Sequence, residues 1–123
     1  MQESYAVPYG ITRIGQNAFY ECRYLTSITL PSSLTSIGKL AFAGCKSLTR
    51  SILPNSLTTI GNGAFAGCES LANITLPNSL TTIGNWAFES CPVSLNFMVV
   101  RGSWAESLCK ENVKNYTYSN SID

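Results

Sequence analysis

The chain has 123 residues, and its eight basic and seven acidic residues leave a formal net charge of +1 without a run of either sign. This length predicts one domain over residues 1–123. The scattered charge argues against nucleic-acid binding, which needs a concentrated basic surface. No apolar stretch approaches the roughly 20 residues that span a bilayer. The start, MQESYAVPYG, lacks the charged head and apolar core of a secretory signal, so none is expected in this chain.

A 23-residue period runs through residues 8–100, where four units can be aligned. Seven positions are identical in all four units: Pro, Thr, Ile, Gly, Ala, Phe and Cys. A period in the twenties predicts a solenoid, in which each repeat forms one coil and buries its apolar side chains against its neighbours.

Residues 1–7 precede the first complete unit. Counting back 23 residues from Ile28 and Leu30 gives Tyr5 and Val7, so this segment matches the strand of a truncated coil. Nothing before it would cover its apolar end. We therefore expect either a shortened array or a homodimer joined through this end, because unpaired strands tend to associate.

One strand per unit is predicted from the apolar spacing. Leu25, Ile28 and Leu30 follow the L-x-x-L-x-L pattern of a leucine-rich-repeat strand, with Thr29 alternating outward. Proline follows this strand in three units, because proline cannot donate a hydrogen bond to a ladder. The expected parallel strands lie near residues 25–30, 48–53, 71–76 and 95–100.

The remainder of each unit returns the chain to the next strand. A second short extended segment places Leu34 and Ile37 inward, and Gly38 is expected to turn the backbone in a conformation that other residues avoid, as are Gly61 and Gly84. The sequence Ala41-Phe42-x-x-Cys45 predicts a short helical or 3₁₀ turn. The equivalent phenylalanines should form one buried column: Phe19, Phe42, Phe65 and Phe88.

These units resemble the BspA-like leucine-rich repeat family, the Treponema-type class, whose repeat has the form C-x-S-L-T-x-I-x-L-P-x-S-L-T-x-I-G-x-x-A-F-x-x-C. The resemblance covers residues 8 to about 99. It implies a β-rich repeat solenoid with a right-handed coil and one parallel sheet. It also implies a cell-surface or secreted protein, because members are typically microbial surface proteins or adhesins that bind host proteins and other microbes.

Two units depart from the pattern. In the second unit, Ser51 takes the inward phase and Ile52 the outward one. Either Ser51 is buried with a backbone partner while Ile52 is exposed, or a bulge returns Ile52 to the core. In the fourth unit, the leucine moves by one position, so that Leu95, Phe97 and Val99 alternate inward as a final strand.

Residues 101–123 predict a C-terminal cap. Ser103 and Glu106 form a capping box that opens a helix of roughly three turns. Ala105, Leu108, Cys109 and Val113 share one face at helical spacing, so the helix should lie across the open end of the stack. Tyr116 and Tyr118 then suggest a short extended tail.

Four of the five cysteines occupy one phase of the repeat: Cys22, Cys45, Cys68 and Cys91. They should stack inward at about 4.8 Å as reduced thiols, because parallel side chains give the wrong dihedral angle for a disulfide. A zinc site is disfavoured, because close cysteine pairs and histidine are absent from the sequence. We expect no cofactor and no catalysis, since no histidine or paired carboxylates could supply acid–base chemistry.

The expected function is protein binding, with a structural spacer or self-assembly segment as the alternative. Solenoids commonly bind along the strand surface, although a plain solvated face would also favour threonine. Trp86 is either an exposed anchor residue or packs on the cap or the next coil. The candidate protein-binding residues are Ser27, Thr29, Arg50, Ile52, Asn73, Thr75, Asn96, Met98 and Trp86.

Overall fold

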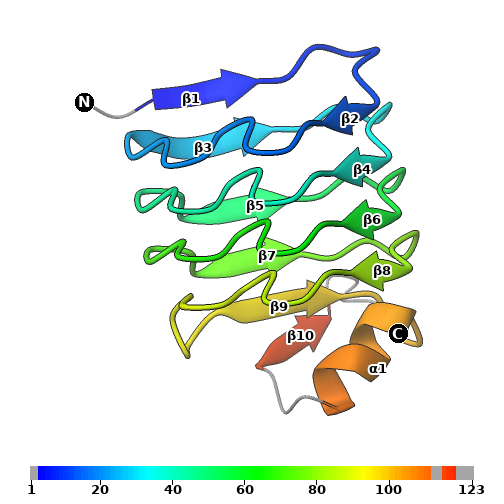
Figure 1. Cartoon of the computed structure of the whole chain (residues 1–123). Helices are drawn as coiled ribbons and strands as arrows, with labels where there is room; N and C mark the ends of the chain where they lie inside the picture. Colours follow the sequence, from blue (N-terminus) through cyan, green and yellow to red (C-terminus); the bar gives the residue numbers. More distant parts are fainter. Residues whose placement is uncertain (1–2, 112–114, 119–123) are drawn as a thin grey trace.

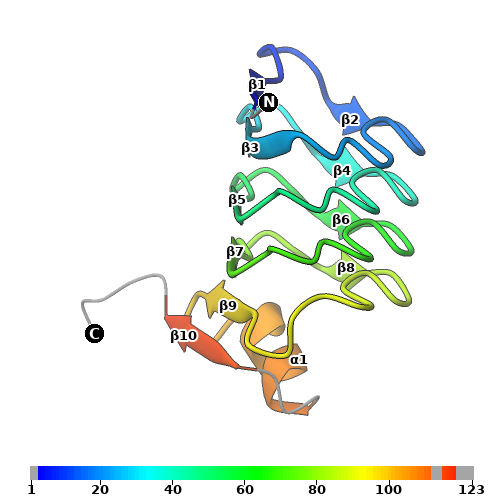
Figure 2. The same ribbon diagram turned by 90° about the vertical axis from the view of Figure 1, so that its left-hand side faces the viewer.

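The computed structural model describes residues 3–111 and 115–118 and shows a stack of coils built from parallel strands (Figure 1). The longer strands line one wall, called here the strand side, and the two-residue strands line a second wall (Figure 2). The strand side contains β1 (Glu3–Ala6), β3 (Leu25–Thr29), β5 (Arg50–Ile52), β7 (Asn73–Thr75), β9 (Asn96–Val99) and β10 (Tyr116–Tyr118). The second wall contains β2 (Arg13–Ile14), β4 (Ser36–Ile37), β6 (Thr59–Ile60) and β8 (Thr82–Ile83).

The strand register follows the 23-residue period. Tyr5 pairs with Ile28 in the β1–β3 ladder, so the first residues form the expected partial coil. Ser51, Ile74 and Phe97 align across β5, β7 and β9. The hydrogen-bonded strands are shorter than predicted, because β5 and β7 contain three residues each.

The expectation of one parallel sheet is corrected in two respects. The short extended segments form a sheet of their own, in the order β2-β4-β6-β8. The strand side is divided into a β1-β3 pair and a β10-β9-β7-β5 sheet, because β3 and β5 do not form a ladder. The parallel solenoid is thus confirmed, and the uninterrupted second wall holds the coils together across the break in the first.

Linked β-turns replace the predicted 3₁₀ segments. In the second coil the Ala41 amide donates to the Gly38 carbonyl at 3.2 Å, whereas the Phe42 amide donates to Ala64 of the next coil at 2.7 Å. A 3₁₀ helix would direct successive amides to acceptors within the segment. Here every second amide instead donates a hydrogen bond to a carbonyl of the next coil, and these bonds join neighbouring coils.

The repeated glycines serve close packing between coils, which corrects the expectation that they turn the backbone. Positive φ occurs two residues later, at Leu40 (57°) and Trp86 (59°). A Cβ atom added to Gly61 would lie 2.8 Å from the backbone carbon of Gly38 and the backbone nitrogen of Lys39. Glycine is required here because any side chain would meet the preceding coil.

The core contains the expected column of phenylalanines, although the two outer rings, Phe19 and Phe88, are half-buried and not fully buried as predicted. Phe42 and Phe65 are fully buried, and adjacent rings are stacked with centroids 5.2 to 5.6 Å apart. Tyr5 extends the column at one end (5.8 Å, tilted) and Phe97 at the other (5.0 Å, edge-on). The thiols lie beside it, and the Cys68 Sγ donates to the Phe42 carbonyl at 3.2 Å.

The cap consists of α1 (Trp104–Glu111) and β10. Ser103 accepts a hydrogen bond from the Glu106 amide at 3.1 Å, and the Glu106 carboxylate accepts one from the Gly102 amide at 2.8 Å. The helix has eight described residues, about two turns, and Val113, which was expected on its apolar face, lies outside the described residues. The tail does form a strand, and its pairing with β9 adds a ladder to the strand side.

Candidate functional site

The predicted binding residues of the strands lie on the strand side, in two columns. Arg50, Asn73 and Asn96 align in one column, and Ile52, Thr75 and Met98 align in the other. Ser27 and Thr29 occupy the same phases on β3. The members on β3 and β5 are exposed and those on β7 and β9 are half-buried, so all eight strand residues share one accessible face.

On the half of this face over β7 and β9, the polar side chains form hydrogen bonds with one another. The Asn96 side-chain amide donates to the Asn73 amide oxygen at 3.5 Å and to the Thr117 hydroxyl at 2.9 Å. The Thr75 hydroxyl contacts the Met98 sulfur at 3.8 Å. Thr117 was not anticipated from the sequence, because it joins the face only when β10 pairs with β9.

The other half of the face contains a groove of about 340 Å³ at the boundary between β3 and β5. Its exposed lining residues are Ser27, Thr29, Arg50 and Ile52, and Ile28 and Leu30 also contribute to it. We call this set the break groove. The structure therefore brings four of the predicted residues together around one depression.

The break in the sheet occurs where a serine, Ser51, takes the inward position and an isoleucine, Ile52, takes the outward one. Ser51 is 2% exposed and Ile52 is 56% exposed, so the inward serine replaces the larger Ile28, Ile74 and Phe97 of the other coils. Of the two arrangements expected from the sequence, burial of serine is therefore correct, but the backbone partner is missing. The Ser51 hydroxyl is buried without a hydrogen bond among the described residues.

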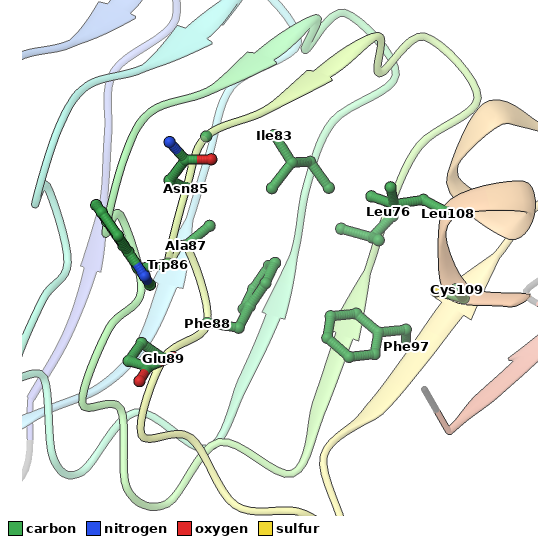
Figure 3. A pocket seen from close by; sticks show the side chains of 11 residues that line it. Leu76, Ile83, Asn85, Trp86, Ala87, Phe88, Glu89, Phe97, Leu108 and Cys109 are labelled. Carbon is green, nitrogen blue, oxygen red and sulfur yellow. The ribbon is translucent and has the colours of Figure 1, made fainter. Parts of the chain in front are cut away.

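Trp86 lies at a second depression, of about 380 Å³, between the last coil and α1 (Figure 3). Phe88 and Phe97 face this space with Leu108 and Ile83, and Trp86 lies at its edge. The indole is 69% exposed, so it does not pack on the cap. The depression could not be inferred from the sequence, because it depends on where α1 sits.

Titratable groups in the core are poor candidates for catalysis. Burial raises the pKa of the Cys45 thiol to about 11 and raises that of Cys68 further. Burial, followed by the nearby Glu3 carboxylate, also raises the pKa of Cys22. The five cysteines form no disulfide with one another. Within the described part of the chain, no cluster of His, Cys, Asp or Glu could hold a metal ion.

Glu106 forms the main polar contact of the cap. It accepts a hydrogen bond from the Tyr118 hydroxyl, and this bond, with that from the Gly102 amide, lowers the pKa of the carboxyl group. The Arg101 guanidinium lies 3.8 Å from the centre of the Tyr118 ring. These groups join α1 to β10 and are structural. Among the described residues, no helix is long and apolar enough to cross a membrane.

Stacked parallel coils with repeated core columns define a leucine-rich-repeat solenoid. The chain belongs to the BspA type leucine rich repeat region family, whose model matches residues 2–122 in six copies. The matched range begins before the four complete units and ends after them. No curated protein matches the chain by sequence.

Three solved structures illustrate the similarity. A leucine-rich repeat protein from Bacteroides ovatus is 30% identical, with a TM-score of 0.78 over 96% of this chain and 30% of its own. A leucine-rich repeat protein from Bacteroides capillosus is 36% identical, with a TM-score of 0.63 over 72% of this chain and 74% of its own. A leucine rich cell surface protein from Faecalibacterium prausnitzii is 30% identical, with a TM-score of 0.64 over 87% and 34%. The chain therefore spans about a third of the first and third of these proteins.

Proposed function

We propose that the chain is a non-catalytic protein-binding module of a microbial cell-surface adhesin, and that its strand side contacts host or other microbial proteins. The observation that carries this proposal is the face formed by the two outward columns, in which Arg50 and Ile52 are exposed beside a groove. A rigid core with a variable outer face is the arrangement that repeat proteins use to bind partners. Membership of the family and similarity to a cell surface protein support a surface or secreted location.

Binding to a panel of purified extracellular-matrix and cell-surface proteins tests the proposal. The variant Arg50→Glu/Ile52→Ser/Met98→Ser should lose binding while largely keeping its melting temperature, because Arg50 and Ile52 are exposed and Met98 is only half-buried. The matched control Lys46→Glu/Val93→Ser changes a cation and an exposed aliphatic side chain outside the strand columns. Equal loss in both variants, or none in the first, would contradict binding through the strand side.

A second candidate function is a spacer or self-assembly segment. Several large apolar side chains are exposed near the N-terminal end, including Tyr9 at 81%. The edge of β1 that faces away from β3 also has no paired strand among the described residues. Two copies that pair through this end would hide both the aromatic surface and the strand edge.

A further inference from the structure

The break groove results from a local change in hydrogen bonding. In the adjacent layers, the Val7 amide donates to the Thr29 carbonyl at 2.9 Å and the Leu53 amide donates to the Thr75 carbonyl at 3.3 Å. The equivalent bond from the Leu30 amide to the Ile52 carbonyl is not formed within the described residues. The two strands therefore lack a ladder bond at the place where the groove opens, and the groove is a specific feature of this layer.

The charge at this groove is uncompensated. Arg50 is the one charged side chain among the described residues of the two outward columns. It forms no ion pair with another described residue. A guanidinium group presents a planar set of donors that matches a carboxylate. An acidic side chain is therefore the complementary group for this position.

Ile52 gives the groove an apolar side. In its column the neighbouring positions carry Thr29 and Thr75, so a side chain that is 56% exposed stands above smaller residues. An isolated exposed aliphatic side chain needs no explanation. Here, however, it borders a depression that also contains a free cation. A partner that fits both features has an aliphatic side chain close to its carboxylate.

We propose that the break groove binds a protein segment in which an aspartate or glutamate stands beside an aliphatic residue. The carboxylate pairs with the Arg50 guanidinium, and the aliphatic side chain packs against Ile52. Ser27 and Thr29 on β3 also line the groove, and their hydroxyl groups provide hydrogen bonds to the main chain of the segment. This inference rests on the proposed function and names the chemistry of the partner's contact.

A random peptide library displayed on phage is a suitable probe, with the immobilised chain as the target. We expect enrichment of peptides with an acidic residue next to Leu, Ile, Val or Met. Synthetic copies should bind Arg50→Glu about tenfold more weakly than the parent chain, because the substitution places like charges together. Their affinity for Lys46→Glu should be unchanged, and their affinity for the parent chain should fall as salt concentration rises.

Backbone amide shifts in an NMR titration then locate the peptide. Shifts at Ser27, Thr29, Arg50 and Ile52 support the inference. Peptides that shift these residues but lack an acidic group, or that bind Arg50→Glu equally well, overturn the inference and leave binding through the strand side intact. Shifts confined to β7 and β9 overturn the inference alone, whereas peptides that shift only residues outside the strand side, or the absence of any enriched peptide, count against both.

Discussion

Identical residues stack on themselves along this molecule, so each coil provides the packing surface of the next. A phenylalanine ring in an interior coil has aromatic neighbours on both faces, and a glycine lies directly against the backbone of the preceding coil. The effect of a substitution therefore depends on the layer as much as on the residue type, because an end layer lacks one of the two neighbours.

Phe65→Ala should lower the free energy of unfolding by about 3–5 kcal/mol, since it removes a fully buried ring from the middle of the column. Phe19→Ala should cost less, because Phe19 is half-buried near the N-terminal end. Urea denaturation followed by circular dichroism measures both. Equal losses would show that the rings do not depend on their neighbours.

Gly61→Ala should destabilise the fold by about 1–3 kcal/mol, because its new methyl group would overlap the backbone of the preceding coil. Gly15→Ala is a control at the same repeat phase, since no atom lies within 4 Å of the position of its Cβ. Thermal melting of both variants is the measurement. A similar melting temperature for the two would refute the close-packing role.

Cys45 and Cys68 should resist alkylation at pH 8 until the protein unfolds, while the half-buried Cys22 reacts sooner. The thiolate is the reactive form, and a pKa of about 11 at Cys45, above the ordinary 9.0, keeps this thiol protonated. The stability that this shift provides is present below pH 9 and is lost as pH rises through 11. Mass spectrometry after timed labelling checks the order. Early modification of Cys68 would contradict the buried ladder.

At the scale of secondary structure, two elements determine how the strand side ends and where it is interrupted. β10 pairs with β9 and is tied to α1 through Tyr118 and Glu106, so the cap continues the sheet while the helix covers the core. β5 instead carries a serine at the inward position and loses its ladder with β3. The strand side thus has an additional paired strand at its C-terminal end and a missing ladder between β3 and β5.

The double variant Ser51→Ile/Ile52→Thr should raise the free energy of unfolding by about 1–3 kcal/mol. It buries an aliphatic side chain in place of an unpaired hydroxyl and restores the pattern of the third coil. Protection of the Leu30 amide from hydrogen exchange should rise as the β3–β5 ladder forms. Unchanged protection would show that the inward serine and outward isoleucine at positions 51 and 52 do not cause the missing β3–β5 ladder.

At the scale of the whole molecule, the two ends differ in how they are covered. α1 and β10 lie over the last coil (Figure 1), whereas β1 is the outermost described layer at the other end. Tyr5, Tyr9, Ile11, Tyr20 and Tyr24 are exposed in the first layers. Among the described residues, one end of the stack is thus covered by the helix and β10, while exposed aromatic side chains gather near the other.

Self-association through residues 2–20 should appear as a concentration-dependent dimer in sedimentation equilibrium. Tyr5→Glu should shift the population to monomer, because it places a charge at the exposed end of the aromatic column. Val93→Glu, at a fully exposed position in the last repeat, is the matched control. A monomer at every concentration, with Tyr5→Glu unchanged in mass and stability, would exclude this dimer.

The sequence alone determined the period, the inward and outward phases and the residues of each column. Tyr5 and Ile28, for example, pair as the 23-residue step predicts. These features follow from the spacing of apolar residues along the chain, which sets the faces of every strand. The capping residues Ser103 and Glu106 were also predictable, because capping depends on local hydrogen bonds.

Only the tertiary structure shows the contacts between neighbouring coils, because these contacts depend on how closely the coils pack. The crowding at Gly61, the bond from Cys68 to the Phe42 carbonyl, and the depression at Trp86 exist only once one layer lies against another. The same holds for the break groove, since Ser51 left two arrangements open in the sequence. Burial of the serine without a partner, and the loss of the β3–β5 ladder, depend on how neighbouring layers fill the core.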